Sequence, residues 1–163
     1  MTGLAAESGA VDPPVESGVI RSAVESDVPE LLAMITELAE FENLADQLSV
    51  TEDGLRQVLF GPEAFAYDLV IDDPAGGLVG HALWFRTFST FLGRPGIWLE
   101  DLYIRPAYRG HGYGTAMLEH LRTLTDGRLE WEVLEWNEPA MDLYQRMGAR
   151  PMAGWTRYRW VEG

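Results

Sequence analysis

The stretch Ile97–Leu124 constrains the fold more than any other, because it joins an apolar strand pattern, a glycine-rich turn and a helical pattern. The strand is expected at Ile97–Ile104, and glycines follow at three alternate positions, Gly110, Gly112 and Gly114. Glycine lets the backbone approach a ligand closely, and the first N–H groups of a helix have no partner inside the helix. This combination predicts a cradle for a phosphate-bearing ligand, with a tight turn that holds no ligand as the alternative.

The glycine run differs from the two common nucleotide-binding motifs. A P-loop has a lysine before its final Ser or Thr, whereas Thr115 here follows Gly114 directly. The dinucleotide fingerprint has the spacing G-x-G-x-x-G, whereas this run has the spacing G-x-G-x-G. The pattern that does fit is Arg/Gln-x-x-Gly-x-Gly/Ala, which covers residues 109–114.

The expected strand carries two adjacent carboxylates, Glu100 and Asp101, in the middle of an apolar run. Apolar residues occupy odd positions before this pair and even positions after it. A parity shift of one residue predicts a bulge, which would splay the strand and free backbone N–H and C=O groups for a ligand. Two acids inside an apolar strand favour a functional role over an ordinary sheet rim, with a structural role for Asp101 as the alternative.

Composition narrows the class of protein. The chain has 163 residues, enough for one domain with a core, and 26 acidic against 12 basic residues give a net charge of −14. This charge argues against a nucleic-acid partner and favours small cationic molecules, with solubility alone as the alternative explanation. The absence of cysteine excludes disulfides and a cysteine nucleophile, and the three histidines share no metal-ligand spacing. Because we find no secretory signal and no membrane-length apolar run, we expect a cytoplasmic protein without a membrane partner.

The order of the remaining patterns predicts one domain at residues 19–163 behind a flexible acidic tail at residues 1–18. Asp27 and Glu30 have the spacing of a capping box at the start of the first helix, and Thr51 is expected to cap the second. Strands are expected at residues 19–21, 67–72, 78–88, 97–104, 129–134 and 155–161, and helices at residues 27–43, 52–59, 112–124 and 140–147. The fold class is α/β in the mixed α+β sense, with helices covering a mixed sheet.

A second motif supports a family assignment. Residues 135–140 read Glu-Trp-Asn-Glu-Pro-Ala, and a helical pattern that contains Tyr144 leads to Gly148-Ala149. With the glycine run, these features resemble the GNAT superfamily of N-acetyltransferases. Over about residues 19–161 the chain is most similar to the diamine acetyltransferase branch, the spermidine/spermine and thialysine enzymes. The resemblance implies a central, mostly antiparallel sheet with a splayed central strand, and an enzyme that uses acetyl-CoA and releases coenzyme A.

The resemblance also implies which residues bind the cofactor. Backbone groups of the splayed strand would pair with the pantetheine arm, the glycine loop would wrap the pyrophosphate, and the second motif would line the thiol end. In this sequence the corresponding residues are Leu102, Tyr103, Ile104, Arg109, Gly110, His111, Gly112, Tyr113, Gly114, Thr115, Asn137, Glu138, Pro139, Ala140 and Tyr144.

In the family the amine attacks the thioester directly. The resemblance therefore implies that Tyr144 protonates the departing thiolate and that Glu100, through water, helps to remove a proton from the ammonium group. Such groups are required because an amine is nucleophilic only when it is neutral. The expected substrate-binding residues are Phe41, Glu42, Glu100, Glu130, Trp131 and Glu132.

One departure from the branch bears on the substrate. The spermidine/spermine enzymes have a longer loop after the residues equivalent to Gly148-Ala149, with an acid just before Gly-Trp, whereas this chain has Ala153 before Gly154-Trp155. A shorter, amino-acid-like amine therefore stays open beside diamines and polyamines. A non-catalytic acyl-CoA-binding domain and a peptide or protein N-acetyltransferase are the alternatives. Members of this branch are dimers, so a homodimer is expected.

Overall fold

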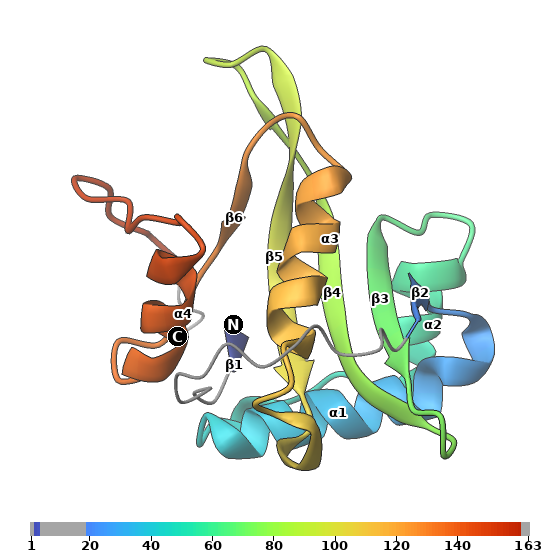
Figure 1. Ribbon diagram of the computed structural model, residues 1–163. Coiled ribbons are helices and arrows are strands. Elements are labelled where there is room, and N and C mark those ends of the chain that lie inside the picture. Colours follow the sequence, from blue (N-terminus) through green and yellow to red (C-terminus); the bar gives the residue numbers. More distant parts are fainter. Residues whose placement is uncertain (1, 4–18, 161–163) are drawn as a thin grey trace.

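The computed structural model describes residues 2–3 and 19–160, and these form one sheet with helices on both faces (Figure 1). The tail expected at residues 1–18 lies outside the described residues apart from Thr2 and Gly3. The sheet has six strands in the order β1-β5-β4-β3-β2, and β6 also pairs with β5. The strands are β1 (Thr2–Gly3), β2 (Ile20–Ser22), β3 (Ala66–Asp72), β4 (Leu78–Ser89), β5 (Arg94–Ile104) and β6 (Leu129–Trp131).

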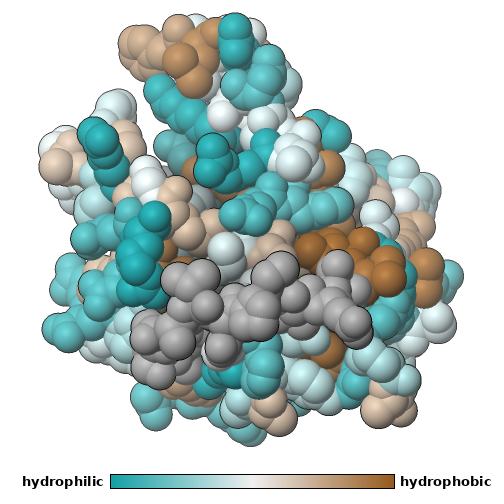
Figure 2. Space-filling view, viewed as in Figure 1, coloured by the Kyte–Doolittle hydropathy of each residue, from teal (hydrophilic) through white to brown (hydrophobic). Residues whose placement is uncertain are grey.

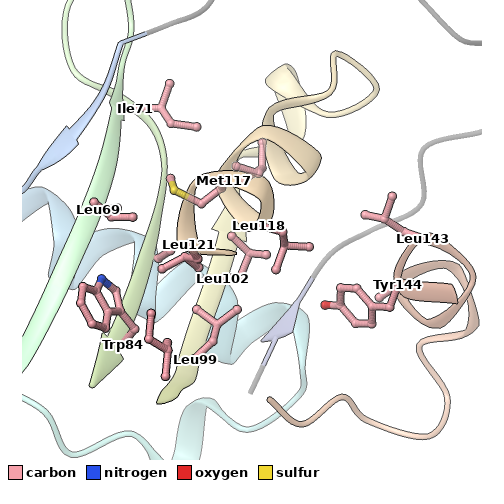
Figure 3. Packing of buried hydrophobic residues seen from close by; sticks show 14 of the residues in the cluster. Leu69, Ile71, Trp84, Leu99, Leu102, Met117, Leu118, Leu121, Leu143 and Tyr144 are labelled. Carbon is pink, nitrogen blue, oxygen red and sulfur yellow. The ribbon is translucent and has the colours of Figure 1, made fainter. Parts of the chain in front are cut away.

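Each face of the sheet has its own apolar core. One core lies beneath α1 (Val28–Phe41) and α2 (Glu52–Phe60), and the other lies beneath α3 (Tyr113–Thr123) and α4 (Glu138–Arg146). Short 3-10 turns occur at Glu25–Asp27, Ala45–Gln47 and Pro106–Tyr108. The second core is built around buried leucines of β5 and α3 and reaches Tyr144 on α4 (Figure 3). These elements confirm the mixed fold class predicted from the sequence.

The predicted bulge in β5 is present at Glu100. β4 and β5 are antiparallel, and Leu83 pairs with Asp101 whereas Trp84 pairs with Leu99, so Glu100 is the extra residue between them. Without this extra residue, the apolar side chains after it would point to the opposite face. With it, the apolar residues on both sides of Glu100 enter the same core, namely Ile97, Leu99, Leu102 and Ile104.

The sheet is splayed beyond this bulge. β6 runs parallel to β5 and pairs with it only over Ile97–Leu99, and it ends at Trp131. β4 continues along the other edge of β5 as far as Ile104. From residue 102 onward, therefore, one edge of β5 is no longer covered by β6, as the splayed strand of the sequence analysis requires.

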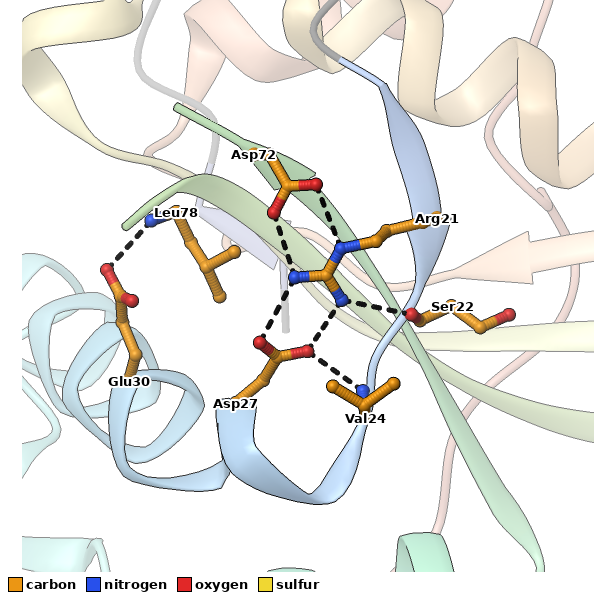
Figure 4. A network of polar contacts seen from close by, with 7 residues as sticks. All are labelled: Arg21, Ser22, Val24, Asp27, Glu30, Asp72 and Leu78. Atoms are coloured by element: carbon orange, nitrogen blue, oxygen red, sulfur yellow. Dashed lines mark hydrogen bonds and ion pairs between the residues drawn. The ribbon is translucent and has the colours of Figure 1, made fainter. Parts of the chain in front are cut away.

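Arg21 connects β2 to the start of α1 and to the end of β3 (Figure 4). Its guanidinium donates to Asp27 Oδ2 at 2.7 Å and to Asp72 Oδ1 at 2.8 Å.

The predicted capping box of α1 is wrong, because Asp27 makes no side-chain cap there and binds Arg21 and the backbone N–H of Val24. Glu30 instead accepts from the backbone N–H of Leu78 at 2.9 Å. The predicted cap of α2 by Thr51 is confirmed.

The predicted last strand is also wrong where the structure describes it. Residues 155–160 form no strand, and Val161 lies outside the described residues. Trp155, Tyr158 and Trp160 alternate with polar residues, but their exposed fractions are 75%, 91% and 99%. An alternating pattern yields a strand only where a neighbouring strand and an apolar surface accept it. Residues 155–160 pair with no strand of residues 19–160, and their aromatic side chains stay exposed.

A second exposed apolar surface lies at the tip of the hairpin formed by β4 and β5, at the top of Figure 2. Its large side chains are Phe88, Phe91 and Leu92, all exposed. Among the helices of the described residues, none has the length and apolar character needed to cross a bilayer.

Gly80 allows β4 to approach β5 closely, so we expect Gly80→Ala to lower the free energy of unfolding by about 1–3 kcal/mol. A Cβ atom at this position would lie 2.5 Å from both the carbonyl oxygen of Tyr103 and Cδ1 of Ile104. Urea unfolding measures the change. Gly54→Ala in α2 is the control, because its nearest neighbour, Thr51 Oγ1, is 3.4 Å away, and stability should hold or rise slightly. Equal stability of both variants would contradict the close approach.

Candidate active site at the splayed strand

The edge of β5 that β6 leaves uncovered is formed by Leu102, Tyr103 and Ile104, of which β1 pairs with the first two, and all three side chains are buried. Leu102 and Ile104 enter the core under α3, whereas Tyr103 enters the core under α1. With the side chains committed to the two cores, the backbone of this segment lies in the plane of the sheet. Its groups on the uncovered edge are suited to pair with an extended, amide-bearing ligand.

The glycine loop leads from this edge into α3. Gly110 and Gly112 have φ angles of 80° and 79°, a left-handed conformation that favours glycine. Within residues 2–3 and 19–160, no atom beyond Gly110 and its two chain neighbours lies within 4 Å of a Cβ atom placed at Gly110. α3 begins after Gly112 without a side-chain cap, and its first residues are Tyr113, Gly114 and Thr115. The loop therefore has the left-handed glycines and the helix start that the predicted phosphate cradle needs.

Two side chains beside the loop hold it in place. The Tyr108 hydroxyl donates to Asp73, which fixes the loop to the turn between β3 and β4. Arg109 donates from Nε to the carbonyl oxygen of Ile104 at 2.8 Å, and its guanidinium carbon lies 5.2 Å from the Phe41 ring centroid and 5.4 Å from that of Tyr103. Burial lowers the pKa of Arg109. The Arg109 side chain thus braces β5 against α1, and His111 lies exposed on the loop, with Nδ1 2.9 Å from the Arg109 carbonyl oxygen.

The bulge gives the two adjacent carboxylates different surroundings. Glu100 is exposed, and its Oε2 accepts from the indole N–H of Trp98 at 2.8 Å. Asp101 is half-buried on the face of α1. Burial raises the pKa of Asp101, while the nearby His81 acts to lower it and Glu100 acts to raise it further. Glu100 is thus the carboxylate open to water, as a base that acts through water must be.

Behind Asp101 lies a buried pair that the sequence analysis missed. His81 Nδ1 lies 3.1 Å from Asp68 Oδ2, and both side chains have an exposed fraction of 0%. Burial alone would lower the pKa of His81, but Asp68 raises it through charge and a hydrogen bond, and Asp101 and Glu37 raise it further through charge. The available signal was a polar residue inside the apolar part of each of two neighbouring strands, but the register that brings Asp68 and His81 together was not readable from the sequence.

Glu42 forms a third acidic position, at the end of α1. Only 4% of it is exposed, and neither carboxylate oxygen has a hydrogen-bond partner among the described residues. Burial raises the pKa of Glu42 to about 7, and the charge of Asp101 contributes in the same direction. Next to it, the Phe41 ring lies 5.7 Å from that of Trp136. A buried carboxylate without a donor, beside a second carboxylate and aromatic rings, is suited to receive a cation.

The second motif is placed on the other side of the splayed edge. Asn137 is buried and caps α4, because its Oδ1 accepts from the N–H of Ala140 at 3.3 Å, and Glu138 and Pro139 form the first turn. Tyr144 is 5% exposed, and its ring packs edge-on against Trp131 at 5.0 Å. Its hydroxyl points from α4 toward the main sheet (Figure 3).

The remaining substrate candidates lie on or just after β6. Glu130 is half-buried and pairs in the sheet with Trp98, next to the bulge. Glu132 forms an ion pair with Arg157, which lowers the pKa of that carboxyl. The Arg157 guanidinium also lies 5.1 Å from the Trp98 ring centroid. Glu132 is therefore neutralised by the C-terminal segment, in contrast to Glu42.

Comparison with known proteins agrees with this geometry. Residues 31–149 match the family model described as the acetyltransferase (GNAT) family. A thialysine N-epsilon-acetyltransferase from Sus scrofa is 39% identical, over 88% of this chain and 92% of that protein. An L-ornithine N5-acetyltransferase from Arabidopsis thaliana is 28% identical, over 86% and 82%. An integron cassette protein of V. cholerae has the same fold, with a TM-score of 0.72 over 88% of this chain and 92% of that one, at 20% identity.

We expect Glu42→Gln to stabilise the protein, and more at neutral than at acidic pH. A carboxyl whose pKa is raised on folding keeps its proton in the folded state while the unfolded state loses it, so stability falls as the pH rises from about 4.5 to 7. Glutamine has no such titration, and the difference should reach about 1–3 kcal/mol at pH 7. Urea unfolding at pH 4.5 and pH 7 measures it, with the exposed Glu40→Gln as control. A gain that does not depend on pH would contradict the raised pKa.

Proposed function

Because the chain belongs to the acetyltransferase (GNAT) family and is an N-acetyltransferase, we propose that it moves an acetyl group from acetyl-CoA to a primary amine of a small cationic substrate. The substrate class comprises diamines, polyamines and amino acids that resemble thialysine. The names of two relatives specify the side-chain amines of thialysine and of ornithine. Such substrates carry at least one further charged group besides the amine that reacts.

The observation that supports a cationic substrate is the unpartnered carboxylate of Glu42. An ammonium group beside Glu42 would place a positive charge against a carboxylate that has no hydrogen-bond partner among the described residues, and it would favour the ionised form of Glu42. The rings of Phe41 and Trp136 border the same place. Trp131 and Glu130, on β6, complete the proposed amine pocket, and the charge of −14 would steer cations toward it.

The residues present fit acetyl-CoA. The edge of β5 beyond Leu99 would pair with the pantetheine arm through its backbone groups, and the loop of Gly110 and Gly112 with the start of α3 would hold the pyrophosphate through N–H groups. Asn137 and Ala140 hold the first turn of α4 at the thiol end. When bound, acetyl-CoA supplies an acetyl group activated as a thioester.

Two side chains would transfer protons in the proposed reaction. Glu100 is exposed at the bulge, so it can accept a proton from the ammonium group through water and leave a neutral, nucleophilic amine. Tyr144 is held by its edge contact with Trp131, and its hydroxyl is the proposed proton donor to the leaving sulfur. Holding the two substrates in line between these groups would supply much of the rate.

The same proposal includes a homodimer located in the cytoplasm. The exposed aromatic residues Trp155, Tyr158 and Trp160 support an interface with a second subunit, because large apolar side chains gathered on a surface are typical of contact sites.

A panel of amines tests the function. Release of coenzyme A from acetyl-CoA is followed with thialysine, lysine, ornithine, spermidine, a monoamine and a peptide with a free N-terminus. We expect turnover with the cationic small amines, and Glu42→Gln should lower kcat/KM for them at least tenfold while Glu40→Gln leaves it unchanged. Binding of coenzyme A without turnover on any amine would favour a non-catalytic domain. Turnover with the peptide alone would favour a protein acetyltransferase.

We expect Tyr144→Phe to lower kcat well over tenfold while the affinity for coenzyme A stays nearly the same. Phenylalanine keeps the packing against Trp131 but has no proton to donate. Steady-state kinetics with the best amine and calorimetry with coenzyme A separate the two effects. Unchanged turnover would remove Tyr144 from the mechanism.

A further inference from the structure

Strand β1 occupies the edge of β5 that β6 leaves uncovered. It runs parallel to β5, with Thr2 opposite Leu102 and Gly3 opposite Tyr103. Because β4 takes the other edge of β5 as far as Ile104, β1 and β6 must share the remaining edge. β6 covers it at Ile97–Leu99, and β1 covers it where β6 has diverged. Figures 1 and 3 show β1 on the side of β5 that faces α4.

This edge is also the one assigned above to the pantetheine arm, so the inference rests on the proposed function. We infer that Thr2–Gly3 is an internal competitor of acetyl-CoA, which pairs with Leu102 and Tyr103 in the free enzyme and has to leave before the cofactor binds. Both competitors would use the same chemistry, because an extended peptide and a pantetheine arm each bind a strand edge through amide groups. A backbone N–H or C=O on this edge cannot serve both at once.

We call Thr2–Gly3 the plug, because its pairing with Leu102 and Tyr103 has the properties of a contact that a ligand can displace. A pairing of two residues contributes only a few ladder hydrogen bonds, so it is weak by itself. Its attachment to the chain keeps it at a constant high local concentration near β5. The plug also satisfies, in the absence of cofactor, backbone groups that would otherwise be left without a strand partner. Acetyl-CoA must therefore compete with a segment that is always present.

Competition of this kind changes the apparent affinity in a defined way. The measured Kd is the intrinsic Kd divided by the fraction of molecules whose edge is free. If the plug occupies the edge in about 70–90% of free molecules, its removal should lower the Kd for coenzyme A about three- to tenfold. The KM for acetyl-CoA should fall with it, whereas kcat at saturation should stay the same, because the plug is absent from the loaded enzyme.

Substitutions in the strand itself provide the test. In the double variant Thr2→Pro/Gly3→Pro both backbone N–H donors are lost, whereas Thr2→Ala/Gly3→Ala retains them and serves as the matched control. A deletion of residues 2–18 removes the plug altogether. Calorimetry measures the Kd for coenzyme A, and hydrogen exchange of the peptide that contains residues 102–104 is measured in the free proteins.

Relative to the unchanged protein, we expect the Kd for coenzyme A to be about three- to tenfold lower in the proline and deletion variants, with faster hydrogen exchange at residues 102–104. We expect no change in the alanine variant. Equal Kd values and equal exchange in all the proteins would overturn the competition and leave the proposed function intact. No binding of coenzyme A by any of the proteins, including the deletion variant, would overturn the proposed function itself.

Discussion

Beyond Leu99, the body of the sheet satisfies the backbone of β5 on one edge only. β4 pairs with β5 as far as Ile104, but β6 ends its pairing at Leu99 and leads away toward α4. Backbone groups in this position need a partner, and either another segment of chain or a ligand has to provide it. The glycine loop follows directly at the end of the uncovered edge, and α4 with Tyr144 faces it. The site is thus arranged around main-chain groups that β6 leaves uncovered and β1 pairs with, rather than around a preformed cluster of side chains.

The bulge that accompanies the splay separates two neighbouring acids into two roles. As the extra residue, Glu100 is exposed and accepts a hydrogen bond from the indole of Trp98. Asp101 faces the α1 side, close to the charges of His81 and Glu42. One irregularity of backbone pairing therefore leaves one carboxylate exposed, at the position proposed for proton transfer, and its neighbour half-buried.

The sequence predicted the features that depend on local patterns. The parity change around Glu100 located the bulge, and the alternate glycines located the loop before α3, because both follow from the geometry of neighbouring residues. The features it did not predict depend on residues far apart in the chain. Asp27 was assigned to a helix cap on local spacing, but Arg21 and the distant Asp72 recruit it into an ion-pair network. The alternation at residues 155–160 was real, yet a strand also needs a neighbour, which no local pattern specifies.

The buried pair of Asp68 and His81 restricts how this sequence can drift over evolution. Each side chain is fully enclosed and balances the other's charge. An apolar substitution of either one alone would therefore leave the other as an unpaired ion in the interior. Replacing both by apolar residues of similar volume removes that penalty. The two positions lie on adjacent strands and should therefore covary across orthologues, which either keep the acid and the imidazole together or lose them together.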